Sequence, residues 1–346
     1  MSPHTTHAIL IERHGAPEVF VEREIPLRDP KGDEVHIRVQ AVGLNFADLL
    51  MRGGLYDTVP PRPYSPGFEV AGVVARVGAE VGDWREGDPV VALLRYGGYA
   101  RDVIVPAKQV FRRPASLSPV EAAAVPVAFL TGWVCLFECG NARPGEKALI
   151  LGAGGGVGTA AVQLAVRRGL QVFGTAGAER KRTFVVDDLG AQACFDSRGN
   201  WEADTVRAVG KRGIDVALDS VGGPATKACR RLLAPLGRLV FYGLSDVMPG
   251  KTRSWLRAAR AMLRMPLIHP YSLIQPSIGV FGVHLLHLQS KEEILRPALA
   301  EIFQGVESGE LHAVVDQTFS FDRAGAVAAH KHVHARKNLG KVLLAE

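Results

Sequence analysis

A glycine-rich turn between two apolar runs constrains the fold of this chain more than any other feature. Residues 148–151 read Ala-Leu-Ile-Leu, the short apolar run that a buried parallel strand shows, and residues 152–158 read Gly-Ala-Gly-Gly-Gly-Val-Gly. A helical pattern follows over 159–168, and a second apolar run covers 170–173. This order predicts a βαβ unit of the kind that binds a dinucleotide.

The turn and the start of the helix have the properties that a pyrophosphate site needs. Glycines let the backbone turn tightly and approach the ligand, and the first N–H groups of the helix can bind its oxygens. Gly155, Gly156 and Val157 are therefore candidate cofactor contacts. An ordinary structural turn is the alternative. We favour the nucleotide site because the complete strand–turn–helix–strand pattern is present.

The residues after the second strand favour NADPH over NADH. An NAD site usually places an acidic residue at this strand end to bind the ribose 2′-hydroxyl. Here Thr175 stands near the strand end, and Lys181 and Arg182 follow shortly after it, which suits a 2′-phosphate. The one nearby acid, Glu179, comes late for a ribose contact. The alternative is that the cations belong to a solvated first turn of the next helix. The sequence does not say which of Lys181 and Arg182 binds the phosphate.

Composition narrows the class of protein. A chain of 346 residues predicts two domains, and its net charge of +6 with interspersed acids and bases gives no reason to expect nucleic-acid binding. The N-terminus has no apolar signal core, and we expect no bilayer-spanning stretch and a cytoplasmic location. The four cysteines lack the paired spacing of a zinc site or a disulfide framework.

The region before the glycine turn has the pattern of a β domain. Alternating polar and apolar residues over 8–45 and further short runs up to 105 are separated by glycine and proline, which predicts a barrel-like β domain. Within it, 43–56 is interpreted as a loop that enters a short helix. After the turn, strands are expected at 215–219, 239–243 and 279–283, with another ending at 194–198, and these continue the parallel sheet.

Several motifs in fixed order resemble a known family. They are Gly-Leu-Asn-Phe-Ala-Asp at 43–48, Pro-Gly-Phe-Glu at 66–69, Leu-Thr-Gly-Trp at 130–133, Asp-Ser-Val-Gly-Gly at 219–223 and Arg-Lys-Asn-Leu-Gly-Lys-Val at 336–342. With the glycine turn, they make the chain similar to the zinc-independent quinone oxidoreductase group of the medium-chain dehydrogenases/reductases. Within that group it resembles the branch of the vesicle amine transport protein 1 homologues.

The resemblance implies an architecture and a set of contacts. It implies a GroES-like catalytic domain from residues 1–125 and 287–346, a doubly wound Rossmann domain from 126–286, and a homodimer. Strand ends of the Rossmann sheet, together with matching family positions, give further candidate cofactor contacts. These are Asn45, Thr131, Arg198, Gly222, Tyr242, Gly243, Phe281, Gly282, Val283, Lys337 and Asn338.

The residue types at the zinc positions of related enzymes argue against a metal. Zinc-dependent relatives use a cysteine in the early loop, a histidine after the Pro-Gly turn and a later cysteine. Here those regions contain Asn45, Phe68 and the thiol-free run 121–124, and neither an amide nor a phenyl ring binds zinc. His330 and His334 are expected to share a face of the last helix and to be solvated.

A metal-free site favours reduction of activated substrates. Hydride transfer from NADPH to a quinone or an α,β-unsaturated carbonyl needs hydrogen-bond donors near the developing oxyanion. Asn45 and Tyr56 are the candidate catalytic donors, carried over from matching family positions. The alternatives are a loop-capping side chain for Asn45 and a cleft wall for Tyr56. Leu50 replaces a tyrosine of some bacterial relatives, which leaves bulky enones or lipid-like substrates open. Asp48 and Arg52, four residues apart, are expected to form a structural pair.

An insertion at 245–278 keeps a second function open. Residues 251–264 include five basic residues and no acid, with apolar residues at helical spacing. Such a helix could lie on an anionic membrane. The favoured interpretation is a cap or dimer-packing helix whose basic face is exposed to solvent. The alternative function is therefore a nucleotide-dependent lipid-transfer or membrane-tethering protein with little turnover.

Overall fold

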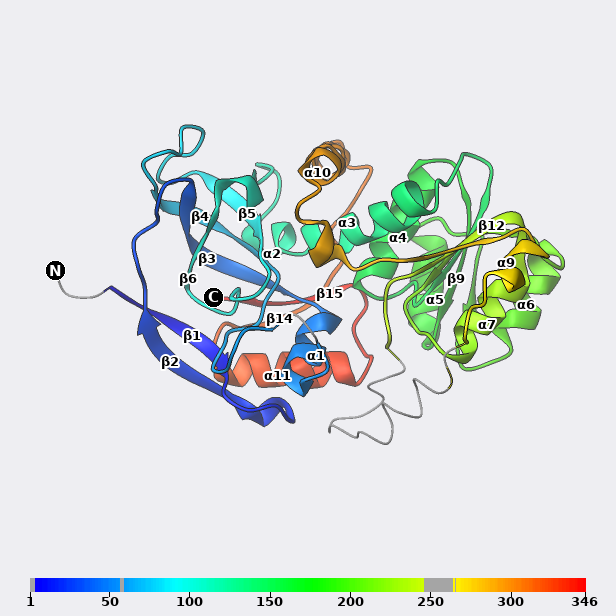
Figure 1. Ribbon diagram of the computed structural model, residues 1–346, viewed down its shortest axis with the longest axis horizontal. Coiled ribbons are helices and arrows are strands. Elements are labelled where there is room, and N and C mark those ends of the chain that lie inside the picture. Colours follow the sequence, from blue (N-terminus) through cyan, green and yellow to red (C-terminus); the bar gives the residue numbers. More distant parts are fainter. Residues whose placement is uncertain (1–3, 57–58, 246–263, 265) are drawn as a thin grey trace. The chain divides into compact units, whose positions relative to one another are not determined.

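The computed structural model describes residues 4–56, 59–245, 264 and 266–346, and their contacts divide them into two compact units (Figure 1). Unit 1 contains the described residues of 1–127 and 313–346, and unit 2 those of 128–249 and 254–312. The first boundary lies close to the predicted one. The second lies later, so residues 287–312 belong to unit 2 and not to the β-rich domain predicted for them. The basic segment 251–264 lies outside the described residues except for Arg264.

Unit 1 is built on a seven-stranded sheet in the order β14-β15-β3-β4-β5-β7, with β6 also paired to β3. Its strand pairs are antiparallel except β14 and β15, and β1 and β2 form a separate hairpin. This confirms the predicted β domain. Its elements are β1 (Thr5–Ile11), η1 (Pro17–Val19), β2 (Phe20–Pro26), β3 (Glu34–Leu44), α1 (Phe46–Gly53), β4 (Glu69–Val77), β5 (Pro89–Leu93), β6 (Asp102–Pro106), η2 (Ala107–Gln109), β7 (Val110–Arg112), α2 (Pro119–Ala122), β14 (Val315–Ser320), α11 (Arg323–His334) and β15 (Lys341–Ala345).

The register of three neighbouring strands in this sheet gathers charged residues at one place. β15 pairs with β3 so that Val342 lies opposite Leu44, which brings Lys341 beside the loop residue Asn45. β3 pairs with β4 so that Val42 lies opposite Val70, which brings Glu69 beside the end of β3. Residues far apart in the sequence therefore meet where β3 ends and α1 begins.

Unit 2 contains a six-stranded parallel sheet in the order β10-β9-β8-β11-β12-β13. Counted along the chain this is the order 3-2-1-4-5-6 of a doubly wound dinucleotide-binding sheet, as predicted. Its elements are α3 (Pro126–Trp133), η3 (Val134–Cys139), β8 (Lys147–Leu151), α4 (Gly156–Arg167), β9 (Gln171–Ala176), α5 (Glu179–Asp187), β10 (Ala193–Asp196), α6 (Trp201–Val209), β11 (Ile214–Asp219), α7 (Pro224–Leu232), β12 (Leu233–Phe241), α9 (Tyr271–Ile274), β13 (Gly279–Gly282), η4 (Leu285–Leu288) and α10 (Glu292–Glu307).

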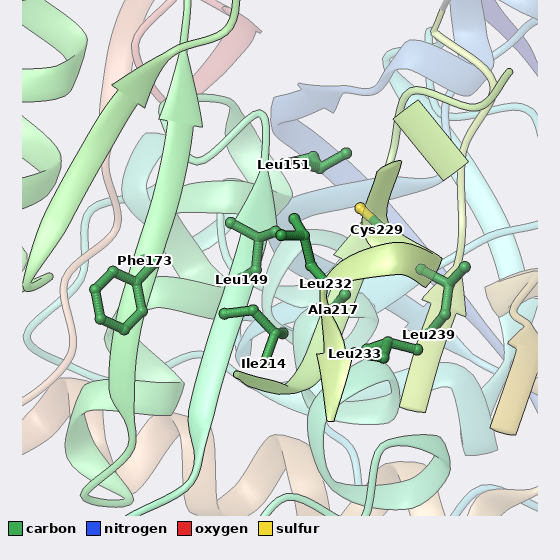
Figure 2. Packing of buried hydrophobic residues seen from close by; sticks show 9 residues of the cluster. All are labelled: Leu149, Leu151, Phe173, Ile214, Ala217, Cys229, Leu232, Leu233 and Leu239. Carbon is green, nitrogen blue, oxygen red and sulfur yellow. The ribbon is translucent and has the colours of Figure 1, made fainter. Parts of the chain in front are cut away.

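Apolar side chains from the sheet and its covering helices fill the core of unit 2 (Figure 2). The cluster contains Leu149, Leu151, Phe173, Ile214, Ala217, Cys229, Leu232, Leu233 and Leu239. The strand runs are apolar on both faces because a parallel sheet is covered by helices on both sides. This packing fixes the strand ends that carry the candidate cofactor contacts.

Polar contacts explain why α10 belongs to unit 2. Arg167 and Arg168, at the end of α4, form ion pairs with Glu310 at 2.6 Å and Glu301 at 2.7 Å. The Gln163 side chain donates to the carbonyl of His312 at 3.1 Å and accepts from its N–H at 2.7 Å. These partners are too far apart in the sequence for their pairing to be predicted from it.

Among the described residues, one helical segment is long and apolar enough to span a membrane, contrary to the expectation of none. The segment Pro119–Cys139, which contains α2, α3 and η3, has a mean hydropathy of 1.8, and 78% of its most apolar window is buried inside the protein. Helices in a protein core have the same composition for the same reason, the exclusion of water. Burial in the protein core therefore accounts for the apolar composition of this segment.

Candidate active site

In unit 2, helix α4 packs directly against the first residues of the glycine turn. A Cβ atom at Gly158 would lie 2.2 Å from the carbonyl oxygen of Gly152 and 2.7 Å from the Cα of Ala153. Gly152 itself has φ of +69°, a conformation that favours glycine. A side chain at Gly158 therefore has no room where the turn meets α4. The N–H groups of Gly156 and Val157, at the start of α4, are suited to bind a pyrophosphate there.

Thr175 stabilises this turn from the neighbouring strand. Its Oγ1 accepts a hydrogen bond from the N–H of Gly152 at 3.3 Å, and its carbonyl oxygen accepts one from the N–H of Ala153 at 2.9 Å. The side chain is 2% exposed. These contacts make Thr175 a support for the glycine turn, whereas the sequence suggested a phosphate contact.

Three cations surround the end of β9. Lys181 is 9% exposed, and a Cβ at Gly154 would lie 3.0 Å from its Cβ, so the lysine lies over the glycine turn. The guanidinium of Arg198 lies against Gly177, where a Cβ would be 3.2 Å from its Nε. Arg182 pairs with Asp196 at 3.7 Å and donates to a main-chain carbonyl. Of the two helix cations, Lys181 is the better candidate for a 2′-phosphate because it lies over the glycine turn.

The other predicted contacts of unit 2 lie where the structure of a Rossmann sheet places a ligand. Gly222, Tyr242 and Gly243 follow the carboxyl ends of β11 and β12, and Phe281, Gly282 and Val283 lie at the end of β13. The buried Asp219 accepts hydrogen bonds from the N–H groups of Val221 and Gly222 at 2.8 and 3.0 Å and from the Thr226 hydroxyl at 2.6 Å. It thus fixes the turn that contains Gly222. Thr131, on α3, is 8% exposed.

The catalytic candidate of unit 1, Asn45, belongs to a buried polar cluster. The ammonium of Lys341 donates to Asn45 Oδ1 at 2.7 Å, to Glu69 Oε1 at 2.7 Å and to the Leu44 carbonyl at 3.0 Å. Asn45 Nδ2 donates to Glu69 Oε1 at 2.9 Å and, at 3.3 Å, to the carbonyl of Gly43. Glu69 Oε2 accepts from the N–H of Val127 at 2.8 Å. We call Asn45, Glu69 and Lys341 the amide–ion cluster.

This cluster was not visible in the sequence as a functional unit. Glu69 and Lys341 each precede an apolar strand run, and a charged residue at such a position is the only signal that could have marked them. Glu69 is fully buried and Lys341 is 4% exposed, whereas Asn45 is partly exposed. Both N–H bonds of the Asn45 amide are engaged inside the protein, which limits its predicted role as a donor to substrate.

The second catalytic candidate, Tyr56, lies beside the position where zinc-dependent relatives have a histidine. Its ring contacts the ring of Phe68 edge-on, with centroids 5.7 Å apart. Phe68 has no donor atom, and the neighbouring Glu69 is already paired with Lys341. These residues do not fit a zinc site. Among the described residues, no group of three His, Cys, Asp or Glu side chains could hold a metal ion. Lys337 and Asn338 follow the turn after α11, where Lys337 is exposed and Asn338 is partly exposed.

Asp48 and Arg52 do not form the ion pair predicted from their spacing. The Asp48 carboxylate accepts hydrogen bonds from the main-chain N–H groups of Asn45 at 2.7 Å and Gly67 at 2.8 Å. Arg52 faces the other way, toward α11, where it donates to the imidazoles of His330 at 3.3 Å and His334 at 2.6 Å. The helical spacing allows a pair, but stronger tertiary partners are available to both side chains.

The histidines of α11 are correspondingly less solvated than expected. His330 is fully buried, and its Nε2 lies 3.1 Å from the hydroxyl of Tyr99. Since Arg52 can only donate, His330 Nδ1 must accept, and the proton of the neutral ring is on Nε2. Burial lowers the pKa of His330 well below its ordinary value, and the Arg52 charge lowers it further.

The environment of Asp48 gives unit 1 a pH-dependent stability. Burial raises the pKa of Asp48 to about 7, against the lowering effect of the two main-chain N–H groups. Because the folded pKa exceeds the unfolded one of about 3.9, this group's contribution is present at low pH and is lost as the pH rises through 7. We expect Asp48→Asn to remove this contribution, so that wild type loses roughly 1–4 kcal/mol relative to the variant between pH 5 and pH 8.

Urea unfolding of both proteins at pH 5, 6, 7 and 8 measures that difference. The exposed Asp33→Asn variant is the control. Its free energy of unfolding should differ from that of wild type by the same amount at every pH. A constant gap between wild type and Asp48→Asn across the series would contradict the expectation.

The fold agrees with the similarities of this chain to known proteins. Residues 31–115 match the family described as alcohol dehydrogenase GroES-like domain, and 189–344 match the one described as zinc-binding dehydrogenase. The chain is 36% identical over 315 residues to the synaptic vesicle membrane protein VAT-1 homolog of Danio rerio; the match covers 91% of this chain but only 64% of that relative.

Two further matches cover nearly whole chains. The quinone oxidoreductase of Sus scrofa is 31% identical over 341 residues, which is 97% of each chain. The solved quinone oxidoreductase of Escherichia coli, complexed with NADPH, is 28% identical with a TM-score of 0.86 over 98% of this chain and 100% of that one. The chain therefore belongs to the medium-chain dehydrogenase/reductase family of oxidoreductases, in the group that contains the quinone oxidoreductases and the VAT-1 homologues.

Proposed function

We propose that this protein is an NADPH-dependent reductase that needs no zinc and transfers hydride to quinones or α,β-unsaturated carbonyls. The observation that carries the proposal is the group of cations at the end of β9, where Lys181 lies over the glycine turn and Arg198 against Gly177. A 2′-phosphate needs such charges at this strand end, whereas a 2′-hydroxyl needs an acid. The quinone oxidoreductases of the pig and of E. coli support the substrate class.

We assign parts of the proposed reaction to the glycine turn, to α4 and to Tyr56. When bound, NADPH supplies the hydride, and the glycine turn and α4 hold its pyrophosphate. Tyr56 supplies a hydroxyl that can donate to the substrate oxygen or orient a water molecule. The apolar ring of Phe68 contacts Tyr56, and Leu50 replaces a tyrosine of some bacterial relatives. Both features favour a bulky, conjugated substrate over a small alcohol.

The test is NADPH oxidation against 9,10-phenanthrenequinone, 1,4-benzoquinone, a medium-chain 2-alkenal and an aliphatic ketone, each with EDTA. We expect turnover of the quinones or the alkenal, unaffected by EDTA and much weaker with NADH. No oxidation of any substrate, together with tight NADPH binding by fluorescence, would overturn the reductase proposal. Loss of activity in EDTA that added zinc restores would overturn its metal-free part.

The cations allow the coenzyme preference to be tested residue by residue. We expect Lys181→Ala and Arg198→Ala each to weaken NADPH binding by roughly 10–100-fold and to leave NADH binding nearly unchanged, because a charged hydrogen bond contributes about 1.5–3 kcal/mol. Arg182→Ala should have a smaller effect, since Arg182 is paired with Asp196. Fluorescence titration with both nucleotides measures this.

The exposed Lys211→Ala variant is the control for the removal of one positive charge. If Lys181→Ala weakened NADH and NADPH equally, Lys181 would act through the shape of the glycine turn and not through the phosphate.

A membrane function is the second candidate. The name of the Danio rerio relative refers to a vesicle membrane, and residues 251–264 of this chain carry five basic residues without an acid. Binding to anionic liposomes that disappears when Arg257, Arg260 and Arg264 are neutralised would favour it. Robust turnover of a quinone without liposome binding would exclude it.

We further propose a cytoplasmic homodimer, with the edge of the unit 2 sheet as the contact. Among the described strands, β13 is at the edge of that sheet, and Phe281 on it is 43% exposed. An unpaired edge strand with an exposed aromatic side chain can pair with the same strand of a second copy. Light scattering after size exclusion should give twice the chain mass, and Phe281→Lys should give the monomer.

A further inference from the structure

We propose that Lys341 is a positioning residue: together with Glu69 it fixes which end of the Asn45 amide is available to a ligand. This inference rests on the proposed function and on the sequence-based prediction that Asn45 belongs to the substrate or cofactor site. It goes further in assigning the chemical character of the contact, which is a hydrogen-bond acceptor.

The ammonium of Lys341 has no capacity left for a ligand. It has three N–H donors, and the structure gives them three acceptors: the Leu44 carbonyl, Asn45 Oδ1 and Glu69 Oε1, at 2.7–3.0 Å. Its side chain is 5% exposed, and that of Glu69 is fully buried. Lys341 therefore acts on a ligand only through the groups it binds.

Glu69 is held as firmly as Lys341. Its Oε2 accepts from the N–H of Val127 at 2.8 Å, and its Oε1 lies over the main chain of β3. A Cβ at Gly43 would come within 2.5 Å of Oε1, so glycine at that position makes room for the carboxylate. The ion pair is thus fixed from β3, β4, β15 and the start of α3.

The two charges determine the orientation of the Asn45 amide. An ammonium can only donate and a carboxylate can only accept, so Oδ1 must face Lys341 and Nδ2 must face Glu69. The reversed amide would place N–H groups against the ammonium and an oxygen against the carboxylate. The oxygen and nitrogen positions therefore follow from the chemistry of the neighbours and not from the shape of the side chain.

The fixed orientation limits what Asn45 can do. Nδ2 has two hydrogens, and they point to Glu69 Oε1 and the Gly43 carbonyl. Oδ1 has two lone pairs, and Lys341 uses one. Because Asn45 is partly exposed, the remaining lone pair can accept a hydrogen bond from a ligand hydroxyl or amide N–H. Asn45 is thus an acceptor that orients a donor group, and oxyanion stabilisation falls to other residues.

The first test reports the orientation of the Asn45 amide and needs no measurement of enzyme activity. In protein with ¹⁵N-labelled asparagine, the Asn45 side-chain amide is assigned with the Asn45→Ala variant, and its hydrogen exchange is compared in wild type, Lys341→Met, Lys341→Met/Glu69→Gln and the exposed control Lys31→Met. In the double variant a neutral glutamine can either donate or accept, so the amide can turn. We expect exchange about tenfold faster or more in both Lys341 variants, with no change in the control.

The second test separates positioning from stability. The double variant removes both charges, so no charge is left buried alone, and it should recover the stability that Lys341→Met loses. We expect the kcat/KM of the double variant for NADPH to stay low, within about twofold of that of Asn45→Ala. Adding Asn45→Ala to the double variant should not lower kcat/KM further, because Lys341 acts through Asn45.

Each outcome decides one point. Unchanged amide exchange in both Lys341 variants, or a triple variant whose loss is the product of the separate losses, would overturn the positioning role. Recovery of kcat/KM together with stability in the double variant would do the same. Wild type without turnover, or Asn45→Ala with full turnover, would overturn the proposed function of this site, while the amide exchange would still report whether Lys341 orients Asn45.

Discussion

We expect the substitution Glu69→Gln to lower the free energy of unfolding by about 3–5 kcal/mol, because it leaves the Lys341 ammonium buried without an anionic partner. The pair is 2.7 Å apart, with side chains 5% and 0% exposed. Glutamine has nearly the same shape, so the effect measures the missing charge and not a cavity. Native-state hydrogen exchange of the β3 and β15 amide groups measures the loss in unit 1 separately from unit 2.

A surface pair in the same unit provides the control. Arg23 and Glu12 lie 2.5 Å apart, but their side chains are 58% and 40% exposed. Glu12→Gln should change the free energy of unfolding by less than about 1 kcal/mol, because water screens an exposed pair. Equal losses for Glu69→Gln and Glu12→Gln would show that the buried cluster does not depend on its charge.

We expect the second large effect from Gly158→Ala, which should weaken NADPH binding by about 100-fold or more, or roughly 2.7 kcal/mol. The added Cβ would meet main-chain atoms of Gly152 and Ala153 at 2.2 and 2.7 Å. Main-chain atoms cannot move aside without opening the turn, so α4 must shift away from β8. The N–H groups at its start would then lose their place at the pyrophosphate.

Gly82→Ala is the matched control, since no atom lies within 4 Å of a Cβ at that position. Fluorescence titration with NADPH compares both variants with wild type, and thermal unfolding shows whether Gly158→Ala still folds. A folded Gly158→Ala that binds NADPH as tightly as wild type would mean that the close approach at this turn is not needed for the nucleotide.

Local patterns in the sequence predicted the fold of the nucleotide-binding unit well. Neighbouring residues encode each of three elements: a strand that is apolar on both faces, a glycine turn and a helix. The repeated alternation of strands and helices then predicts a parallel sheet for the later strands. The cations after β9 could likewise be read directly. What the sequence did not show is that Arg182 pairs with Asp196 and that Thr175 supports the turn, because both depend on the packing of adjacent strands.

The histidines and the charged residues of α1 show where local reasoning fails. A spacing of four residues brings Asp48 and Arg52 to one helical face, but the main-chain N–H of Asn45, three residues before Asp48, competes for its carboxylate. In the folded protein, main-chain N–H groups of Asn45 and Gly67 reach Asp48, and the two imidazoles of α11 reach Arg52. Asn45 is a local partner, but the others lie 19 to 282 residues away, so only the tertiary structure brings them together.

The sequence by itself determined the family, the two-domain plan, the Rossmann order and the glycine turn, because short-range periodicity and fixed motifs encode them. The tertiary structure alone decided the polarity of the Asn45 amide. That polarity depends on Lys341 and Glu69, which come from strands at opposite ends of the chain and meet only through the register of β15, β3 and β4. A buried charge acts through distance and geometry, and neither is written in the order of the residues.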